Sequence, residues 1–170
     1  MDAANRRQAI FRRLEHADAP VSASLLAEEF SVSRQIVVGD IALLRAAGTE
    51  ISATPRGYVL ARPEPGILRT VACRHDMAGT REELYILVDH GCAVLDVVVE
   101  HAVYGQLAGQ LQLKSRYDVD QFMDRLIGEG AKPLSDLTHG IHLHTLRCPD
   151  EQAFERACAA LRAAGFLLEA

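Results

Sequence analysis

The spacing of apolar side chains predicts three helices in the first third of the chain. Apolar positions recur at helical spacing in residues 5–16, which predicts an amphipathic helix. Ser22 and Ser33 can each cap the start of a further helix, a short one that ends at Phe30 and a longer one that ends at Gly48. A short helix, a tight turn and a longer helix together predict a helix-turn-helix.

The segment after the third helix predicts a wing. Ile51 begins a short strand, residues 54–57 contain the proline and glycine of a turn, and residues 58–60 return as a second strand. Arg56 lies at the tip of this hairpin. The first part of the chain is therefore expected to be a winged helix-turn-helix.

Residues 61–66 contain two prolines and a glycine, which discourage regular structure and indicate a domain boundary. We expect one domain at 1–62 and a second at 67–170. Charge differs across this boundary: residues 1–62 hold eight Lys and Arg against seven Asp and Glu, and the rest holds ten against sixteen. The acidic excess of the chain therefore belongs to the second domain.

Strands and helices alternate in the second domain. Apolar and β-branched runs predict strands at residues 68–74, 92–100, 103–113, 141–147 and 166–168. Helical spacing predicts helices at residues 80–90, 118–130 and 150–164. Thr80 and Glu83 have the spacing of a capping box, and Asp118 can cap the second of these helices. The whole chain is expected to be α+β, with a winged helix-turn-helix followed by helices packed on a mostly antiparallel sheet.

Composition limits the class of protein. The chain has 170 residues, 49% of them hydrophobic, which is enough for a buried core. No apolar run approaches the ~18 residues that can span a bilayer, and no apolar stretch of a signal peptide is present. We therefore expect a soluble, cytoplasmic protein without a membrane partner. The four cysteines form no C-x-x-C pair, and we interpret them as small buried hydrophobic residues.

The first turn of the third helix carries the residues expected to contact a double-stranded DNA operator. In helix-turn-helix modules the start of the recognition helix meets base edges in the major groove, which here places Ser33, Arg34 and Gln35 there. Arg can read guanine, Gln can read adenine, and Arg56 of the wing can contact a phosphate. The nearly balanced charge of this domain is weak for a lone DNA binder, so we expect a homodimer. The alternative is a helix-turn-helix that serves protein contacts.

Two histidines of a late strand are the main candidates for metal chemistry. His142 and His144 are two residues apart, so both rings lie on one face of a strand. Imidazole suits zinc, nickel, copper and iron. Hydrogen-bonded structural histidines are the alternative interpretation.

The motifs of the chain, taken in order, resemble those of the bacterial niacin-responsive repressors of NAD-biosynthesis genes, which join a winged helix-turn-helix to a three-histidine (3H) domain. The matching segments are residues 32–35, 40–48, 75, 82–84, 88–91, 96–101, 103–105, 115–116, 133–138 and 142–145. Two departures are Ala102, where the family usually has proline, and the additional His139.

This resemblance implies a divalent metal, nickel, zinc or iron, held by four side chains. Carried over by motif, these are His75, Glu83, His142 and His144, although Glu82 competes with Glu83 because only one of two adjacent helical residues can face the site. Three imidazoles and a carboxylate can form a closed shell or leave a position open for an effector.

The family also implies nicotinic acid or a related carboxylate as effector. The candidates for this pocket are His101, Tyr104 and Arg116, since an arginine can pair bidentately with a carboxylate. His101 can instead fix its own loop by a hydrogen bond, and Arg116 can form an ordinary surface ion pair.

The resemblance implies a ligand-responsive repressor of NAD-biosynthesis or niacin-uptake genes. A DNA-binding dimer with a purely structural metal is the alternative. An enzyme is a weaker alternative, because the chain lacks the H-E-x-x-H motif of metalloproteases. We therefore do not expect an enzyme.

Overall fold

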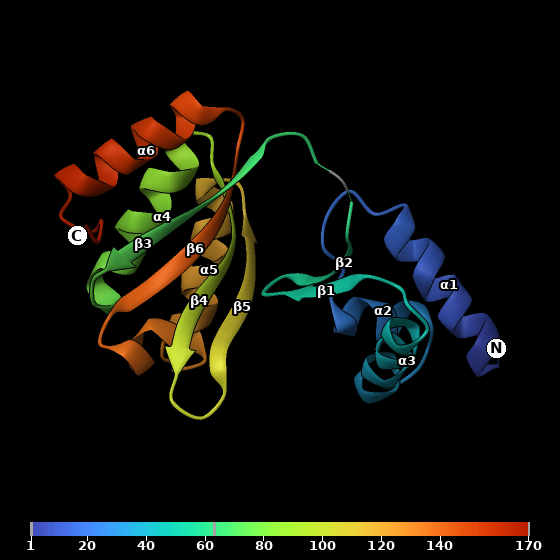
Figure 1. The fold of residues 1–170 in the computed structure, drawn as a ribbon. Helices are drawn as coiled ribbons and strands as arrows, with labels where there is room; N and C mark the ends of the chain where they lie inside the picture. The colour runs from blue at the N-terminus through green and yellow to red at the C-terminus, as the bar shows by residue number, and fades with distance from the viewer. Residues whose placement is uncertain (1, 63, 170) are drawn as a thin grey trace. The chain divides into compact units, whose positions relative to one another are not determined.

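The computed structural model describes residues 2–62 and 64–169. The chain forms two compact units, Met1–Pro63 and Glu64–Ala170. The first unit contains three helices and a hairpin, and the second contains three α-helices beside a four-stranded sheet (Figure 1). The predicted α+β fold is confirmed.

The first unit is a winged helix-turn-helix. Its elements are α1 (Ala3–Glu15), α2 (Ala23–Glu29), α3 (Arg34–Ala46), β1 (Ile51–Thr54) and β2 (Gly57–Leu60). The side chains of Ser22 and Ser33 cap α2 and α3 as predicted, because each accepts a hydrogen bond from a backbone N–H in the first turn. The helices enclose an apolar core that includes Ile10, Leu26 and Ile41, each at most 1% exposed.

The wing is tied to the start of α2. β1 and β2 pair antiparallel, and Val21 forms an isolated bridge to Tyr58. Gly57 has a φ of +138°, and a Cβ placed there would lie 2.4 Å from the carbonyl carbon of Val21. Only glycine therefore lets the wing approach the helices this closely.

The second unit is a four-stranded sheet with helices on one face. Its strands are β3 (Ile67–Arg74), β4 (Ala93–His101), β5 (Gly105–Leu113) and β6 (Ile141–Cys148), in the order β3-β6-β4-β5 with every neighbouring pair antiparallel. The helices are α4 (Thr80–Asp89), α5 (Arg116–Gly128) and α6 (Glu151–Ala163), with short 3-10 turns η1 (Met77–Gly79) and η2 (Leu134–Thr138). All three helices pack into one apolar core with the sheet (Figure 1).

Three local predictions for this unit are wrong. Thr80 and Glu83 form no capping box: Gly79 occupies the cap position without a side-chain bond, and the Glu83 carboxylate is engaged by histidines instead. Ser115, not Asp118, caps α5, since the helix begins earlier than predicted. Residues 166–168 form an isolated bridge rather than a strand: Leu167 pairs with Cys73 of β3, and backbone hydrogen bonds join Phe166 to Arg74 and Leu168 to Ala72.

None of the helices in the described part of the chain is both long and apolar enough to cross a membrane.

Candidate functional site

Three histidines and one glutamate meet between α4 and the sheet. His142 and His144 lie on β6 and are each 3% exposed. Their partners across the strand pair are Cys73 and Val71 of β3, both core residues. Since paired residues of antiparallel strands share a face, both histidine rings lie on the face that the helices cover.

Glu83 of α4 is the centre of this cluster. It lies on the buried side of the helix and is 1% exposed, whereas its neighbour Glu82 is exposed. One Glu83 oxygen, Oε2, lies 2.7 Å from Nε2 of His75 and 3.3 Å from Nε2 of His144, and Oε1 lies 3.1 Å from Nε2 of His142. All three predicted histidines therefore present the same ring nitrogen to one carboxylate.

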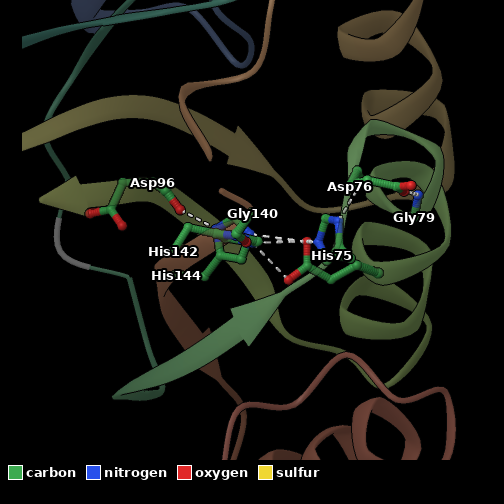
Figure 2. Close-up of polar contacts among 8 residues, drawn as sticks. His75, Asp76, Gly79, Asp96, Gly140, His142 and His144 are labelled. Atoms are coloured by element: carbon green, nitrogen blue, oxygen red, sulfur yellow. Dashed lines mark hydrogen bonds and ion pairs between the residues drawn. The ribbon is translucent and has the colours of Figure 1, made fainter. Parts of the chain in front are cut away.

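The other ring nitrogen of each histidine is held by the backbone (Figure 2). His75 Nδ1 lies 2.7 Å from the carbonyl oxygen of Asp76, His142 Nδ1 lies 2.9 Å from that of Gly140, and His144 Nδ1 lies 2.6 Å from that of Asp96. A carbonyl oxygen can only accept, so each Nδ1 carries the proton and donates it. Each Nε2 is thereby left as the nitrogen that can bind a metal, which is the usual arrangement of histidine ligands.

Two glycines leave room for His75 just beyond the end of β3. Gly140 has a φ of +90°, and a Cβ there would lie 2.3 Å from the carbonyl oxygen of His75. A Cβ on Gly79 would lie 3.0 Å from the Cβ of His75 and from the ring of Phe166. A side chain at either glycine would therefore displace His75 or the segment that holds it.

Electrostatics couple the glutamate to the histidines. Burial alone would raise the pKa of Glu83, but the charge of His144 and hydrogen bonds from the histidines hold that pKa well below its usual value. Burial likewise works to lower the pKa of His75 and of His144, yet the Glu83 carboxylate raises both. Glu83 is therefore an ionised buried carboxylate that accepts hydrogen bonds from the histidine rings.

The donor set suits a divalent transition metal. Imidazole nitrogens and a carboxylate bind zinc, nickel and iron, and such an ion can replace the hydrogen bonds between the rings and Glu83. The assignment of His75, Glu83, His142 and His144 as ligands stays a prediction, and their convergence supports it.

One residue of this cluster was missed at the level of sequence. The donor atoms of Cys73, Glu83 and His142 all lie within 4.8 Å of one another, and the three residues are buried. The sequence indicates for Cys73 only a small buried residue, and it is indeed buried. The Cys-x-His spacing of Cys73 and His75 at the end of a strand was the available signal.

The residues predicted to contact the effector do not form one pocket within a chain. His101 and Tyr104 lie at the β4–β5 turn, where His101 Nδ1 accepts hydrogen bonds from the backbone N–H groups of Val103 and Tyr104. Arg116 lies beyond the opposite end of β5, a strand whose nine residues span roughly 27 Å. Arg116 therefore lies apart from His101 and Tyr104 within one chain, and the role of these three residues in effector binding stays a prediction.

Arg116 has partners of its own. Its guanidinium pairs with the carboxylate of Asp89, 2.5 Å away, and lies 4.3 Å from the ring centre of Tyr85. Tyr104, in contrast, is 74% exposed. The ordinary surface ion pair, one of the two alternatives for Arg116, is therefore present.

The predicted DNA-contacting residues lie at the start of α3 and in the wing. Arg34 and Gln35 are exposed in the first turn of α3, and the Ser33 side chain caps that turn. Arg56 lies in the turn between β1 and β2 and is half-buried, with its backbone N–H donated to Thr54 Oγ1. Arg34 and Gln35 are accessible to a ligand of this unit.

Comparison with known proteins identifies both halves of the chain. Residues 6–59 match a model of a helix-turn-helix (HTH) domain, and residues 68–170 match a model of the 3H domain. A joined HTH and 3H domain defines a class of DNA-binding regulators of transcription.

Two relatives match nearly the full length. The chain is 45% identical over 164 residues to the probable transcription repressor NiaR of Thermotoga maritima, covering 96% of this chain and 94% of the relative. It is 41% identical over 170 residues to the transcription repressor NadR of Bacillus subtilis, covering 98% of this chain and 94% of the relative. The chain therefore belongs to this family of 3H-domain transcription repressors. The resemblance seen in the motifs is confirmed, and the protein is a DNA-binding repressor and not an enzyme.

Proposed function

We propose that this chain is a metal-dependent repressor that responds to nicotinic acid and controls genes of NAD biosynthesis or niacin uptake. Residues 1–62 bind the operator, and residues 67–170 bind the metal and the effector. The protein acts as a homodimer whose two recognition helices reach half-sites about 34 Å apart. Binding of the effector favours one arrangement of the dimer and thereby changes its affinity for DNA.

The observation that carries this proposal is the convergence of three Nε2 atoms on Glu83. His75, Glu83, His142 and His144 hold the metal. The bound ion supplies a positive charge that attracts a small carboxylate. Because the backbone carbonyl groups keep each Nδ1 protonated, the rings are oriented for the metal before it arrives.

DNA recognition is assigned to the first turn of α3. Arg34 and Gln35 read base edges, Ser33 caps the helix and contacts a phosphate, and Arg56 contacts a phosphate from the wing. Arg34→Ala and Gln35→Ala are each expected to weaken operator binding by about 1–3 kcal/mol and to relax specificity at one base pair. Arg56→Ala is expected to weaken binding to all sequences alike, measured by fluorescence anisotropy at several salt concentrations.

The decisive experiment is calorimetric titration of nicotinic acid into the metal-loaded and the metal-stripped protein. Binding to the loaded form alone is expected, together with a lower dissociation constant for the operator when nicotinic acid is saturating. An operator dissociation constant that does not change at saturating nicotinic acid would exclude this effector.

His139→Ala provides a matched control for His142→Ala. His139 is exposed and adjoins the same strand, whereas His142 contacts Glu83. We expect His142→Ala to lose both the metal and the response to nicotinic acid while it keeps basal DNA binding. His139→Ala should keep all three properties. Wild-type metal content in purified His142→Ala would contradict the ligand assignment.

A structural metal is the second candidate function. It is favoured by the burial of the donors, since Glu83, His142 and His144 are each at most 3% exposed. In this case metal raises the stability of the second unit, and nicotinic acid binds neither form of the protein. The same titration distinguishes the two candidates.

A further inference from the structure

Cys73 is the closest unassigned donor to the histidine–glutamate cluster. It lies on β3, is completely buried, and pairs across the sheet with His142. Because the two residues are directly opposite, the thiol and the imidazole lie on the same, helix-covered face. The register of β3 against β6 therefore places the Cys73 sulfur atom at the predicted metal site.

The distances allow sulfur to share one ion with the other donors. The ligand atoms of Cys73, Glu83 and His142 lie within 4.8 Å of one another. Zinc binds sulfur at about 2.3 Å and imidazole nitrogen at about 2.0–2.1 Å, so two donors on opposite sides of one ion are roughly 4.4 Å apart. A small side-chain adjustment is enough to bring all three within bonding distance.

Charge is the second argument. A divalent ion with three neutral imidazoles and a single carboxylate has a net charge of +1. The surrounding site is deeply buried, since Cys73, Glu83, His142 and His144 are at most 3% exposed. An uncompensated charge in such a place is costly, and one thiolate would remove it.

The nearest aspartates are engaged elsewhere. Asp76 accepts a hydrogen bond from the backbone N–H of Gly79, and Asp96 accepts one from the backbone N–H of Thr145. Figure 2 shows both carboxyl groups directed away from the rings of His75, His142 and His144. The sulfur of Cys73 is thus the better-placed second anion.

We propose that Cys73, as a thiolate, is a fifth protein ligand of the metal that His75, Glu83, His142 and His144 hold. This inference rests on the proposed metal site. When the ion enters, the Cys73 thiol releases its proton to solvent, a sulfur–metal bond forms, and no electron is transferred. The site would then supply five protein donors to the ion.

The thiol is protonated until the ion arrives. Burial raises the pKa of the Cys73 thiol, and the neighbouring Glu83 charge raises it further. A soft sulfur ligand also favours zinc, nickel, cobalt or iron over magnesium and calcium, which prefer oxygen. The inference therefore narrows the metals that the site accepts.

Cobalt(II) added to the full-length, metal-stripped protein tests this assignment, because a cobalt–thiolate bond produces a charge-transfer band in the near ultraviolet. We expect this band in the wild-type protein, in proportion to bound cobalt. Cys73→Ser should still bind cobalt, seen by the visible d–d bands, but lose the charge-transfer band. Cys158→Ser, changed at a half-buried cysteine of α6, should keep it.

Each outcome decides the question. Cobalt that binds the wild-type protein without a thiolate band overturns the role of Cys73 and leaves the proposed metal site intact. A band that persists in Cys73→Ser overturns the assignment to this cysteine. Failure of the wild-type protein to bind cobalt, nickel or zinc overturns both proposals.

X-ray absorption of the zinc-loaded wild-type protein gives an answer that does not depend on the folding of any variant. One sulfur neighbour per zinc at about 2.3 Å is expected. A shell of nitrogen and oxygen alone overturns the inference.

Discussion

Two buried carboxylates, one in each unit, have partners of different kinds. Asp40 of α3 is 4% exposed, and its oxygens lie 2.6 Å from Nε of Arg6 and 3.6 Å from Nη1 of Arg7. Glu83 of α4 is 1% exposed and contacts only imidazole nitrogens among the hydrogen bonds described for its side chain. Both carboxylates are satisfied, yet the positive charges that satisfy them differ.

An arginine cannot give up its proton in a protein, whereas a histidine can. The side-chain hydrogen bond to Asp40 raises the pKa of Arg6 still further, so that pair has a permanent charge. The partners of Glu83 are imidazole rings, whose Nε2 atoms can exchange a proton for a metal. The buried carboxylate of Asp40 therefore belongs to a permanent ion pair, whereas that of Glu83 has partners that a metal can replace.

The largest expected effect is that of removing the Glu83 charge. Glu83→Gln keeps the size of the side chain but removes the anionic ligand, and metal affinity should fall by more than the about 10–100-fold that loss of a supporting group costs. Glu82→Gln, on the exposed neighbour, should bind metal like the wild type. Calorimetric titration with zinc or nickel measures the metal affinity of each variant. Equal affinities would show that Glu83 is not a ligand.

Metal should stabilise only the unit that contains Glu83. At an ion concentration about 100-fold above the dissociation constant, the free energy of unfolding of the second unit should increase by about 2.7 kcal/mol. For a unit of this size, the melting temperature should then rise by roughly 10 °C or more. The melting of the first unit should not change. Differential scanning calorimetry with and without a chelator measures the melting temperature of each unit. Equal shifts of the two transitions would contradict selective binding of the metal by the second unit.

Asp40→Asn should affect the opposite unit. The substitution leaves Arg6 without its carboxylate partner, so the melting temperature of the first unit should fall by several degrees. The metal affinity of the second unit should stay at the wild-type value, measured by the same titration. A loss of metal binding would show that the two carboxylates are coupled.

The smallest effect is expected at Thr80. Its Oγ1 is buried and finds no hydrogen-bond partner among the described residues, since Glu83 faces the histidines. Thr80→Val removes this unsatisfied hydroxyl at nearly constant size, so we expect a stability equal to the wild type or higher by up to about 1 kcal/mol. Urea denaturation of the metal-free protein measures it, and a clear loss of stability would indicate that the hydroxyl has a partner.

Much of the first unit could be predicted because its signals are local. Ser22 and Ser33 cap the helices that their positions indicated, and the turn at residues 54–57 lies between the two strands of the wing. Capping and tight turns depend on residues a few positions apart, which a sequence displays directly. The capping box predicted from Thr80 and Glu83 is wrong, because the Glu83 carboxylate contacts His142, which is distant in the sequence.

The candidate site divides in the same way. The two-residue period of a strand by itself put His142 and His144 on one face, and motif resemblance by itself indicated His75 and Glu83. Only the tertiary structure decided that Glu83 and not Glu82 faces the rings, that Cys73 lies opposite His142, and that Arg116 is remote from Tyr104. The physical reason is that periodicity follows from the geometry of a single element, whereas strand register and helix orientation depend on packing between elements distant in the chain.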